Sequence, residues 1–73
     1  MHSSQEKGTF ITPREREVLS LVGKGKTTKE IAGILCLSPA TIGNHRRSLC
    51  RKLDLHSTAQ LVSYGSRLEI TVM

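Results

Sequence analysis

The sequence predicts an all-α fold of four short helices in a single small domain. Four segments carry the side chains that cap helix N-termini, and each is followed by apolar residues that recur every three or four positions. The chain has 73 residues, of which 37% are hydrophobic. A chain of this length buries only about 60% of its unfolded surface. We therefore expect one hydrophobic core and no additional ligand cavity.

The first helix is expected from Ile11 to Val22. Thr12, Pro13 and Glu15 have the order of an N-cap, a first-turn proline and an acid at the third helical position. The apolar face of this helix consists of Val18, Leu19, Leu21 and Val22. The preceding segment, residues 1–10, is polar and without hydrophobic period, so it is expected to be a flexible arm or linker.

Two further features of this region have a local interpretation. Glu17 lies three positions after Arg14 and can pair with an arginine, either partly buried or in solvent. The following segment, residues 23–26, contains two glycines that end the helix and turn the chain. The spacing G-x-x-x-x-G-K-[ST] is absent and no strand precedes the glycines, so we reject a nucleotide-binding loop.

The starts of the two central helices are specified by capping residues. Thr27 and Glu30 match the reciprocal capping box, in which the threonine accepts from the third helical amide and the glutamate reaches back. Ser38 followed by Pro39 matches an N-cap with proline at the first helical position, where the missing N–H costs nothing. The same reading makes Ser38 a cap and not a nucleophile.

These caps leave the first central helix only the stretch from about Thr28 to Cys36. Leu37 alone separates it from the next cap, so the two helices must cross at a steep angle. That arrangement is the helix-turn-helix. Apolar residues recur at helical spacing in both helices: Ile31, Ala32, Ile34 and Leu35 in the first, and Ile42, His45 (or Arg46), Leu49 and Leu53 in the second.

A second, polar stripe on the helix after Ser38 indicates nucleic acid. It consists of Ala40, Gly43, Asn44, Arg47 and Arg51. Amide and guanidinium groups pair bidentately with adenine and guanine edges in the major groove. The net charge is +5, and the stretch from Lys24 to Lys52 holds seven basic residues and one acid. Such a concentration of positive charge on one supersecondary unit predicts phosphate binding.

The stripe and its flanks give a specific set of expected contacts. Base edges are assigned to Asn44 and Arg47, with Gly43 allowing a close approach of the backbone. Threonines at a helix N-terminus are suited to an anion. The backbone phosphates are assigned to the side chains that flank the groove: Lys24, Lys26, Thr27, Thr28, Lys29, Thr41, Arg46, Arg51 and Lys52.

A fourth helix is expected from Thr58 to about Leu68, followed by a frayed tail over residues 69–73. Ser57 and Gln60 form a third capping box at its start. The helix carries more apolar and small residues than one core stripe needs, which predicts a contact with a second copy across a two-fold axis. Leu61, Tyr64, Gly65 and Leu68 are expected toward the core, and the dimer contact is assigned to Ala59, Val62, Ser63 and Ser66.

Metal and catalytic chemistry fit the sequence poorly. Cys36 and Cys50 are 14 positions apart and a fourth zinc ligand beside them and His45 is unassigned. We expect no metal and no cofactor, and interpret both cysteines as small core residues and His45 as structural. Paired carboxylates in an apolar setting are absent, as is a nucleophile beside a base, so no catalytic residues and no enzyme activity are expected.

Composition restricts the remaining classes. Phe10 and Tyr64 are the only aromatic residues, which argues against single-strand binding on stacked aromatic platforms. No apolar run follows Met1, and no stretch approaches the ~20 apolar residues of a membrane helix. We expect a cytoplasmic protein with reduced thiols and no contact with a membrane.

Several spaced blocks resemble the LuxR-type (GerE-like) DNA-binding domain of bacterial response regulators and small regulators. They are residues 12–19, 28–32, 37–38, 41–42, His45, 52–53 and Leu55. The resemblance covers Ile11 to about Leu68. It implies a four-helix domain with the third helix in the major groove, dimerisation through the fourth helix, and sequence-specific regulation of transcription. The family usually has lysine at Gly43 and often arginine at Thr58, and these departures concern the target sequence and the phosphate contacts.

The alternative is a basic protein-interaction module that contacts RNA polymerase or another regulator without reading DNA. Such a surface would carry aromatic or aliphatic anchors where this chain has Asn44 and Arg47. A sigma-factor-like promoter-reading domain uses the same helix-turn-helix, but the flanking blocks fit it less well. The sequence thus predicts a homodimer that binds double-stranded DNA, with RNA polymerase as a further candidate partner.

Overall fold

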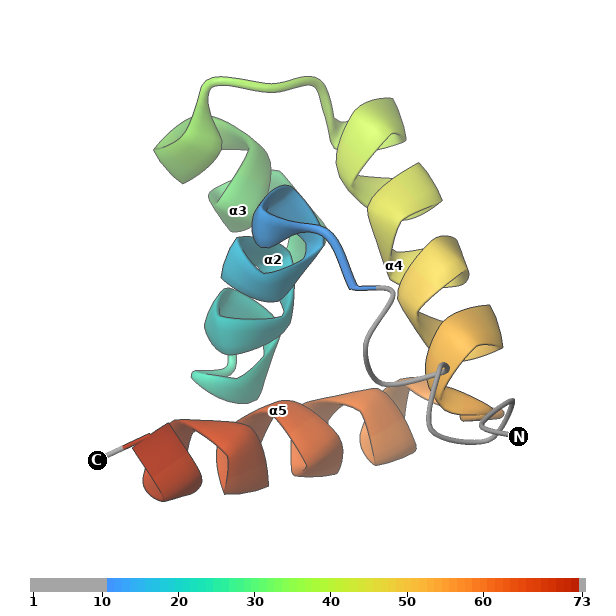
Figure 1. Cartoon of the computed structure of the whole chain (residues 1–73). Helices are drawn as coiled ribbons and strands as arrows, with labels where there is room; N and C mark the ends of the chain where they lie inside the picture. Colours follow the sequence, from blue (N-terminus) through green and yellow to red (C-terminus); the bar gives the residue numbers. More distant parts are fainter. Residues whose placement is uncertain (1–10, 73) are drawn as a thin grey trace.

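The computed structural model describes residues 11–72, with side chains described as far as Arg67 (Figure 1). Over that range the chain forms four helices and no strand, which confirms the expected all-α fold. The helices are α2 (Pro13–Gly23), α3 (Thr28–Leu35), α4 (Pro39–Leu53) and α5 (Thr58–Val72). The expected arm over residues 1–10 lies outside the described residues.

The predicted capping residues begin the first three helices. Thr12 and Glu15 exchange two hydrogen bonds of 3.0 Å, so the capping box before α2 is complete. Thr27 and Glu30 exchange bonds of 2.8 and 3.1 Å before α3. The Ser38 hydroxyl accepts from the third backbone N–H of α4 at 3.1 Å. These caps are contacts across three residues, which is why the local sequence predicts them.

The last helix differs from the expectation at both ends. The Ser57 hydroxyl accepts from the Gln60 N–H at 3.1 Å, as a capping box requires. The Gln60 side chain, however, accepts from the N–H of His56 and not from that of Ser57. Helix α5 continues to Val72, beyond the expected end at Leu68. Residues 69–72 contain neither glycine nor proline, so nothing in them stops the helix.

The turn between α3 and α4 corrects two expectations about Cys36. This residue ends α3 in the left-handed conformation, with φ 59°, and is exposed. The N–H of Leu37 then returns to the carbonyl of Ala32 at 2.9 Å, which satisfies a carbonyl at the helix end. Cys36 is therefore neither helical nor a core residue. Cys50 is half-buried and packs against the core, in line with its expected role.

All four helices contribute to one hydrophobic core. Its buried residues are Val18, Leu19 and Val22 of α2, Ile31 and Ala32 of α3, Ile42 and Leu49 of α4, and Leu61 of α5. Helix α2 packs against each of the other three and is the hub of the domain (Figure 1). Ile34 was expected on the same face but is 52% exposed. On a short helix it projects too far around the axis from Ile31 and Ala32 to reach the core.

The backbones of α2 and α5 touch where the two helices cross. Gly65 is buried, and a Cβ atom on it would lie 2.5 Å from the carbonyl oxygen of Leu19. A Cβ atom on Gly23 would lie 2.4 Å from the backbone of Gly65. Only glycine allows this approach at either position. The contact fixes α5 across the end of α2, along the lower edge of the molecule in Figure 1.

Candidate nucleic-acid interface

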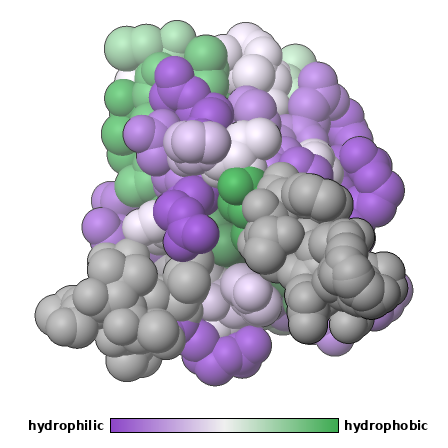
Figure 2. Space-filling model, viewed as in Figure 1, coloured by the Kyte–Doolittle hydropathy of each residue, from purple (hydrophilic) through white to green (hydrophobic). Residues whose placement is uncertain are grey.

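Helix α4 has a buried face and a polar face, as its sequence period predicts. Ile42 and Leu49 are fully buried against the core. The expected outer stripe is exposed at Ala40, Asn44, Arg47 and Arg51, and half-buried at Gly43. In space-filling view, hydrophilic surface covers the side on which α4 lies, whereas hydrophobic surface gathers over α3 (Figure 2). The polar face of α4 is thus available to a ligand from solvent.

The two side chains assigned to base edges contact each other. Nη2 of Arg47 donates a hydrogen bond to Oδ1 of Asn44, one helical turn earlier. Gly43 leaves open space beside this pair, since a Cβ atom there would meet only Nη1 of Arg47, at 4.0 Å. The sequence placed these three residues on one face. The structure adds that Asn44 and Arg47 form a joined pair.

An open hollow of about 450 Å³ lies beside the polar face of α4. Guanidinium groups of three arginines border it, and so do the first residues of α3 and α5, Thr28 and Thr58. Helix N-termini and guanidinium groups both favour anions. The lining residues are Thr28, Gly43, Arg46, Arg47, Cys50, Arg51, Thr58 and Leu61. Thr58 was not among the expected contacts, although its position just after the Ser57 cap could have indicated it.

The other expected phosphate contacts lie around the start of the helix-turn-helix. Lys24, Lys26, Thr27 and Lys29 are exposed between the end of α2 and the first turn of α3. Thr41, in the first turn of α4, is half-buried and its hydroxyl accepts from Ser38 at 2.9 Å. The chain therefore brings basic side chains to the same end of the domain as the capped N-terminus of α3.

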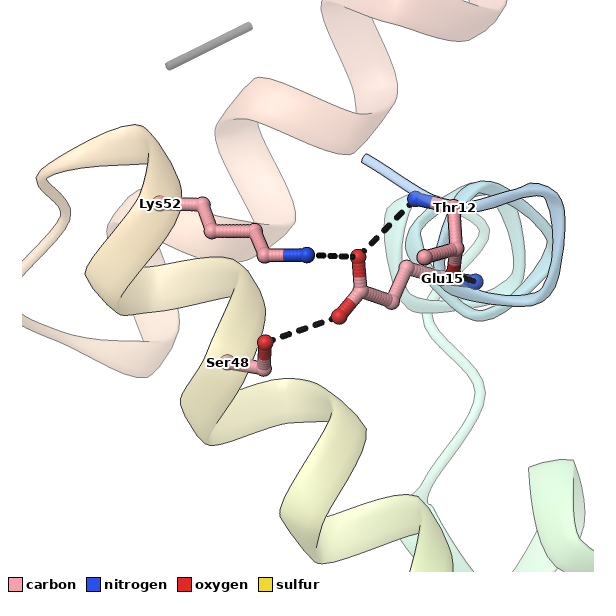
Figure 3. A network of polar contacts seen from close by, with 4 residues as sticks. All are labelled: Thr12, Glu15, Ser48 and Lys52. Carbon is pink, nitrogen blue, oxygen red and sulfur yellow. Dashed lines mark hydrogen bonds and ion pairs between the residues drawn. The ribbon is translucent and has the colours of Figure 1, made fainter. Parts of the chain in front are cut away.

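A buried carboxylate joins α2 to α4 (Figure 3). Glu15 is 5% exposed, and its Oε1 accepts from Thr12 N–H at 3.0 Å and pairs with Lys52 Nζ at 2.8 Å. Its Oε2 accepts from Ser48 Oγ at 2.8 Å. Burial raises the pKa of Glu15, but hydrogen bonds from Lys52, Thr12 and Ser48 outweigh it and lower the pKa from 4.5 to about 2. The network fixes how α4 lies against α2.

The buried acid of α2 is Glu15, whereas Glu17 is 57% exposed and pairs with Arg14 at 3.1 Å, which is the solvated one of the two arrangements that the sequence left open. Lys52 was assigned to phosphate, but in this structure its ammonium group lies on Glu15. No local signal could reveal this pairing, because 37 residues separate the two partners. The burial of Glu15 and its pairing with Lys52 both depend on how α4 passes the N-terminus of α2.

In the fourth helix, the residues expected toward the core are buried or half-buried where the structure describes their side chains. Leu61 and Gly65 are buried and Tyr64 is half-buried, while the side chain of Leu68 lies outside the described residues. Of the residues assigned to a dimer contact, Ala59 and Ser63 are exposed, whereas Val62 and Ser66 are half-buried. Val62 packs against the core. A shallow groove of about 360 Å³ runs over the outer side, lined by Leu55, Ala59, Gln60, Ser63 and Arg67.

Within the described part of the chain, none of the helices has both the length and the apolar character needed to cross a membrane. Over the same residues, no three His, Cys, Asp or Glu side chains lie close enough together to hold a metal ion. Cys36, His45 and Cys50 do not form such a group.

Comparisons with known proteins agree with this geometry. Residues 9–65 match the family described as GerE, bacterial regulatory proteins of the luxR family. The chain is 43% identical over 60 residues to the uncharacterized response regulatory protein YgeK of Escherichia coli, covering 82% of this chain and 41% of that protein. It is 44% identical over 61 residues to the transcriptional regulatory protein MctR of Rhizobium johnstonii, covering 84% and 28%.

The match to a third relative extends over a larger share of this chain than the first two matches do. The oxygen regulatory protein NreC of Staphylococcus carnosus is 33% identical over 69 residues, which is 94% of this chain and 32% of that protein. The chain thus spans less than half the length of these curated relatives. None of the solved protein structures matches it significantly.

Proposed function

The chain belongs to the LuxR family of bacterial regulatory proteins, and on that premise we propose that it inserts α4 into the major groove and binds as a dimer on two half-sites. The family is one of transcription regulators, which are not enzymes, and its helix-turn-helix domain implies DNA binding. We also propose that it acts in the bacterial cytoplasm, where chromosomal DNA lies.

The observation that carries the proposal is the polar face of α4. Asn44, Arg47 and Arg51 are exposed on a helix whose opposite face is locked into the core. These groups are suited to base edges and phosphates. The Glu15 network holds the same helix against α2, so its side chains keep a fixed direction toward the groove. We assign base contacts to Asn44 and Arg47, with Gly43 under them.

The proposed phosphate contacts surround this face. Arg46 and Arg51 border the hollow that also takes in the start of α3, and a backbone phosphate there would meet guanidinium groups and a helix N-terminus. Lys24, Lys26, Thr27, Thr28, Lys29 and Thr41 complete the set. Lys52 is expected to contribute less than the exposed lysines, because Glu15 already compensates its charge.

The experiment that tests the function compares Arg47→Ala on a selected site and on random duplex DNA. We expect a loss of about 1–3 kcal/mol on the selected site and a much smaller loss on random DNA, since a bidentate base contact is present in only one of them. Equal losses on both would reduce Arg47 to a phosphate clamp and contradict the proposed reading face.

Lys29→Ala is the matched control for the electrostatic part. This variant should lower the affinity for the selected site and for random DNA by the same factor. It should also reduce the slope of log affinity against log salt by about 0.9, the value for one phosphate contact. Lys52→Ala should reduce the slope by less. An unchanged slope in Lys29→Ala would place the phosphate contacts elsewhere.

A contact with RNA polymerase is a further proposal, and it concerns a different face. Ile34 is the exposed large apolar side chain of the described residues, and it lies on α3 outside the core. Apolar anchors of this kind are typical of protein interfaces. If Ile34→Ser left retention of purified RNA polymerase unchanged, this face would not be the contact.

A further inference from the structure

Asn44 and Arg47 contact each other before any DNA is bound. Both side chains are exposed on α4, and Nη2 of Arg47 donates to Oδ1 of Asn44. Nη1 of Arg47 lies near the open space above Gly43, 4.0 Å from the position of an added Cβ atom. Any longer side chain at position 43 would compete with the guanidinium for this space. The glycine thus permits the arginine to fold back over the helix toward Asn44.

The contact changes what Asn44 can offer to a base. A free carboxamide has an acceptor, Oδ1, and two N–H donors on Nδ2. Bidentate pairing with adenine uses both, because Oδ1 must accept from the adenine N6 amino group while Nδ2 donates to N7. In this structure a guanidinium already donates to Oδ1, so one of the two lone pairs of this oxygen is taken, and the positive charge repels the partly positive N6 amino group. Pairing of Asn44 with adenine is therefore disfavoured, while its N–H groups can still donate.

Arg47 has donors only, and it retains enough of them to read a base. A guanidinium carries five N–H groups in a fixed plane and no acceptor. One of them is used on Asn44. Bidentate pairing with O6 and N7 of guanine requires two more. Hydrogen-bond donors therefore predominate in the pair, and the guanidinium charge favours acceptors opposite it.

We propose that Asn44 and Arg47 act as one positively charged reading unit, in which donors predominate, and that this unit selects guanine over adenine in each half-site; the proposal rests on the proposed function. Guanine presents two acceptors in the major groove, N7 and O6. Adenine and cytosine each present an amino donor there, which would face the donors of the pair. Two independent readers would instead allow Asn44 to select adenine.

The test begins with selection of bound duplexes by the whole chain, followed by replacement of single atoms in the selected site. We expect guanine at the position that the pair reads. Replacing it with 7-deazaguanine removes the N7 acceptor and should weaken binding by about fivefold or more, the equivalent of 1 kcal/mol. Hypoxanthine keeps N7 and O6 and lacks only the minor-groove amino group, so it should bind as guanine does.

A pair of variants separates one unit from two readers. Arg47→Ala frees Oδ1 of Asn44, so the variant should accept adenine and the ratio of guanine to adenine affinity should fall by about fivefold or more. Arg51→Ala is the matched control. It removes the same charge one turn further along α4, lies about two helical turns from Asn44, and should weaken binding without changing that ratio.

Failure of the joint reading unit and failure of the proposed function would give different results. Selection of adenine at this position by the unmodified chain, or an unchanged ratio in Arg47→Ala, would overturn the joint reading unit and leave sequence-specific binding intact. Absence of any sequence preference would overturn the proposed function itself.

Discussion

Glu15 is a buried residue of α2 whose contacts extend to a second helix. Its two oxygens serve the cap of α2 and two side chains of α4, so one carboxylate specifies both a helix start and a helix position. A buried charge without partners would be strongly destabilising, whereas here several donors compensate it. The lowered pKa records that compensation.

The pH dependence of stability follows from this shift. The pKa of Glu15 is about 2 in the folded chain and 4.5 when unperturbed, so its contribution is present above pH 4.5 and is lost as pH falls toward 2. The loss should amount to at most about 3 kcal/mol. Urea unfolding between pH 7 and pH 2.5 should show a flatter profile for Glu15→Gln than for the unmodified chain.

Glu17→Gln serves as the control, since this acid is exposed and its pair with Arg14 contributes little. Its pH profile should follow that of the unmodified chain. If Glu15→Gln also followed it, the carboxylate would not be the group that titrates with unfolding.

At the scale of the elements, the crossing of α2 and α5 decides the shape of the domain. The backbones meet at Gly23 and Gly65, with space for hydrogen atoms only. Small residues at both positions are required because larger ones would separate the helices. This contact holds α5 at an angle that leaves its outer groove in solvent.

Gly65→Ala should therefore destabilise the domain by about 1–3 kcal/mol, because its methyl group would lie 2.5 Å from the Leu19 carbonyl oxygen. Gly33→Ala is the matched control. Gly33 is exposed within α3 with nothing within 4 Å of an added Cβ atom, so alanine should stabilise the chain by about 0.5–1 kcal/mol. Thermal unfolding of both variants measures the difference. Equal shifts in both would mean that the crossing is not tightly packed.

At the scale of the whole molecule, the proposed function gives each copy one reading helix, which would reach only a few base pairs. Two copies about one helical turn of DNA apart would combine their binding energies. The exposed groove over α5 is the surface that we propose for their contact, with Ala59 and Ser63 at its surface. Val62 and Ser66 are half-buried, so they would contribute at its edge.

Ala59→Glu should reduce cooperative binding to a duplex with two half-sites by about tenfold, because the two-fold axis would bring two like charges together. Binding to a single half-site should hold. Val62→Glu would be a poorer test, since Val62 packs against the core and its loss would also affect folding. Ile34→Glu adds the same charge to exposed surface of α3 and should leave cooperativity unchanged. Cooperativity that survived Ala59→Glu would place the dimer contact on another face.

The sequence by itself determined the features that depend on neighbours a few residues apart. Thr12, Thr27 and Ser38 begin their helices through hydrogen bonds across three residues, and the period of α4 separates its core face from its polar face. The position of the helix-turn-helix follows from the same caps. Helix formation brings these partners close together, so the three N-caps were confirmed, whereas the Gln60 side chain accepts from His56 and not from Ser57.

Only the tertiary structure decided the features that depend on how helices cross. Ser48 and Lys52 contact Glu15 across 33 and 37 residues of sequence. The packing that brings them together buries Glu15, while Glu17 stays in solvent. The same packing leaves Ile34 exposed. The helical period determines which residues share a face. The angle and distance between helices decide which of those residues contact a residue of another helix. That geometry arises from close packing of the whole core, which no short stretch of sequence contains.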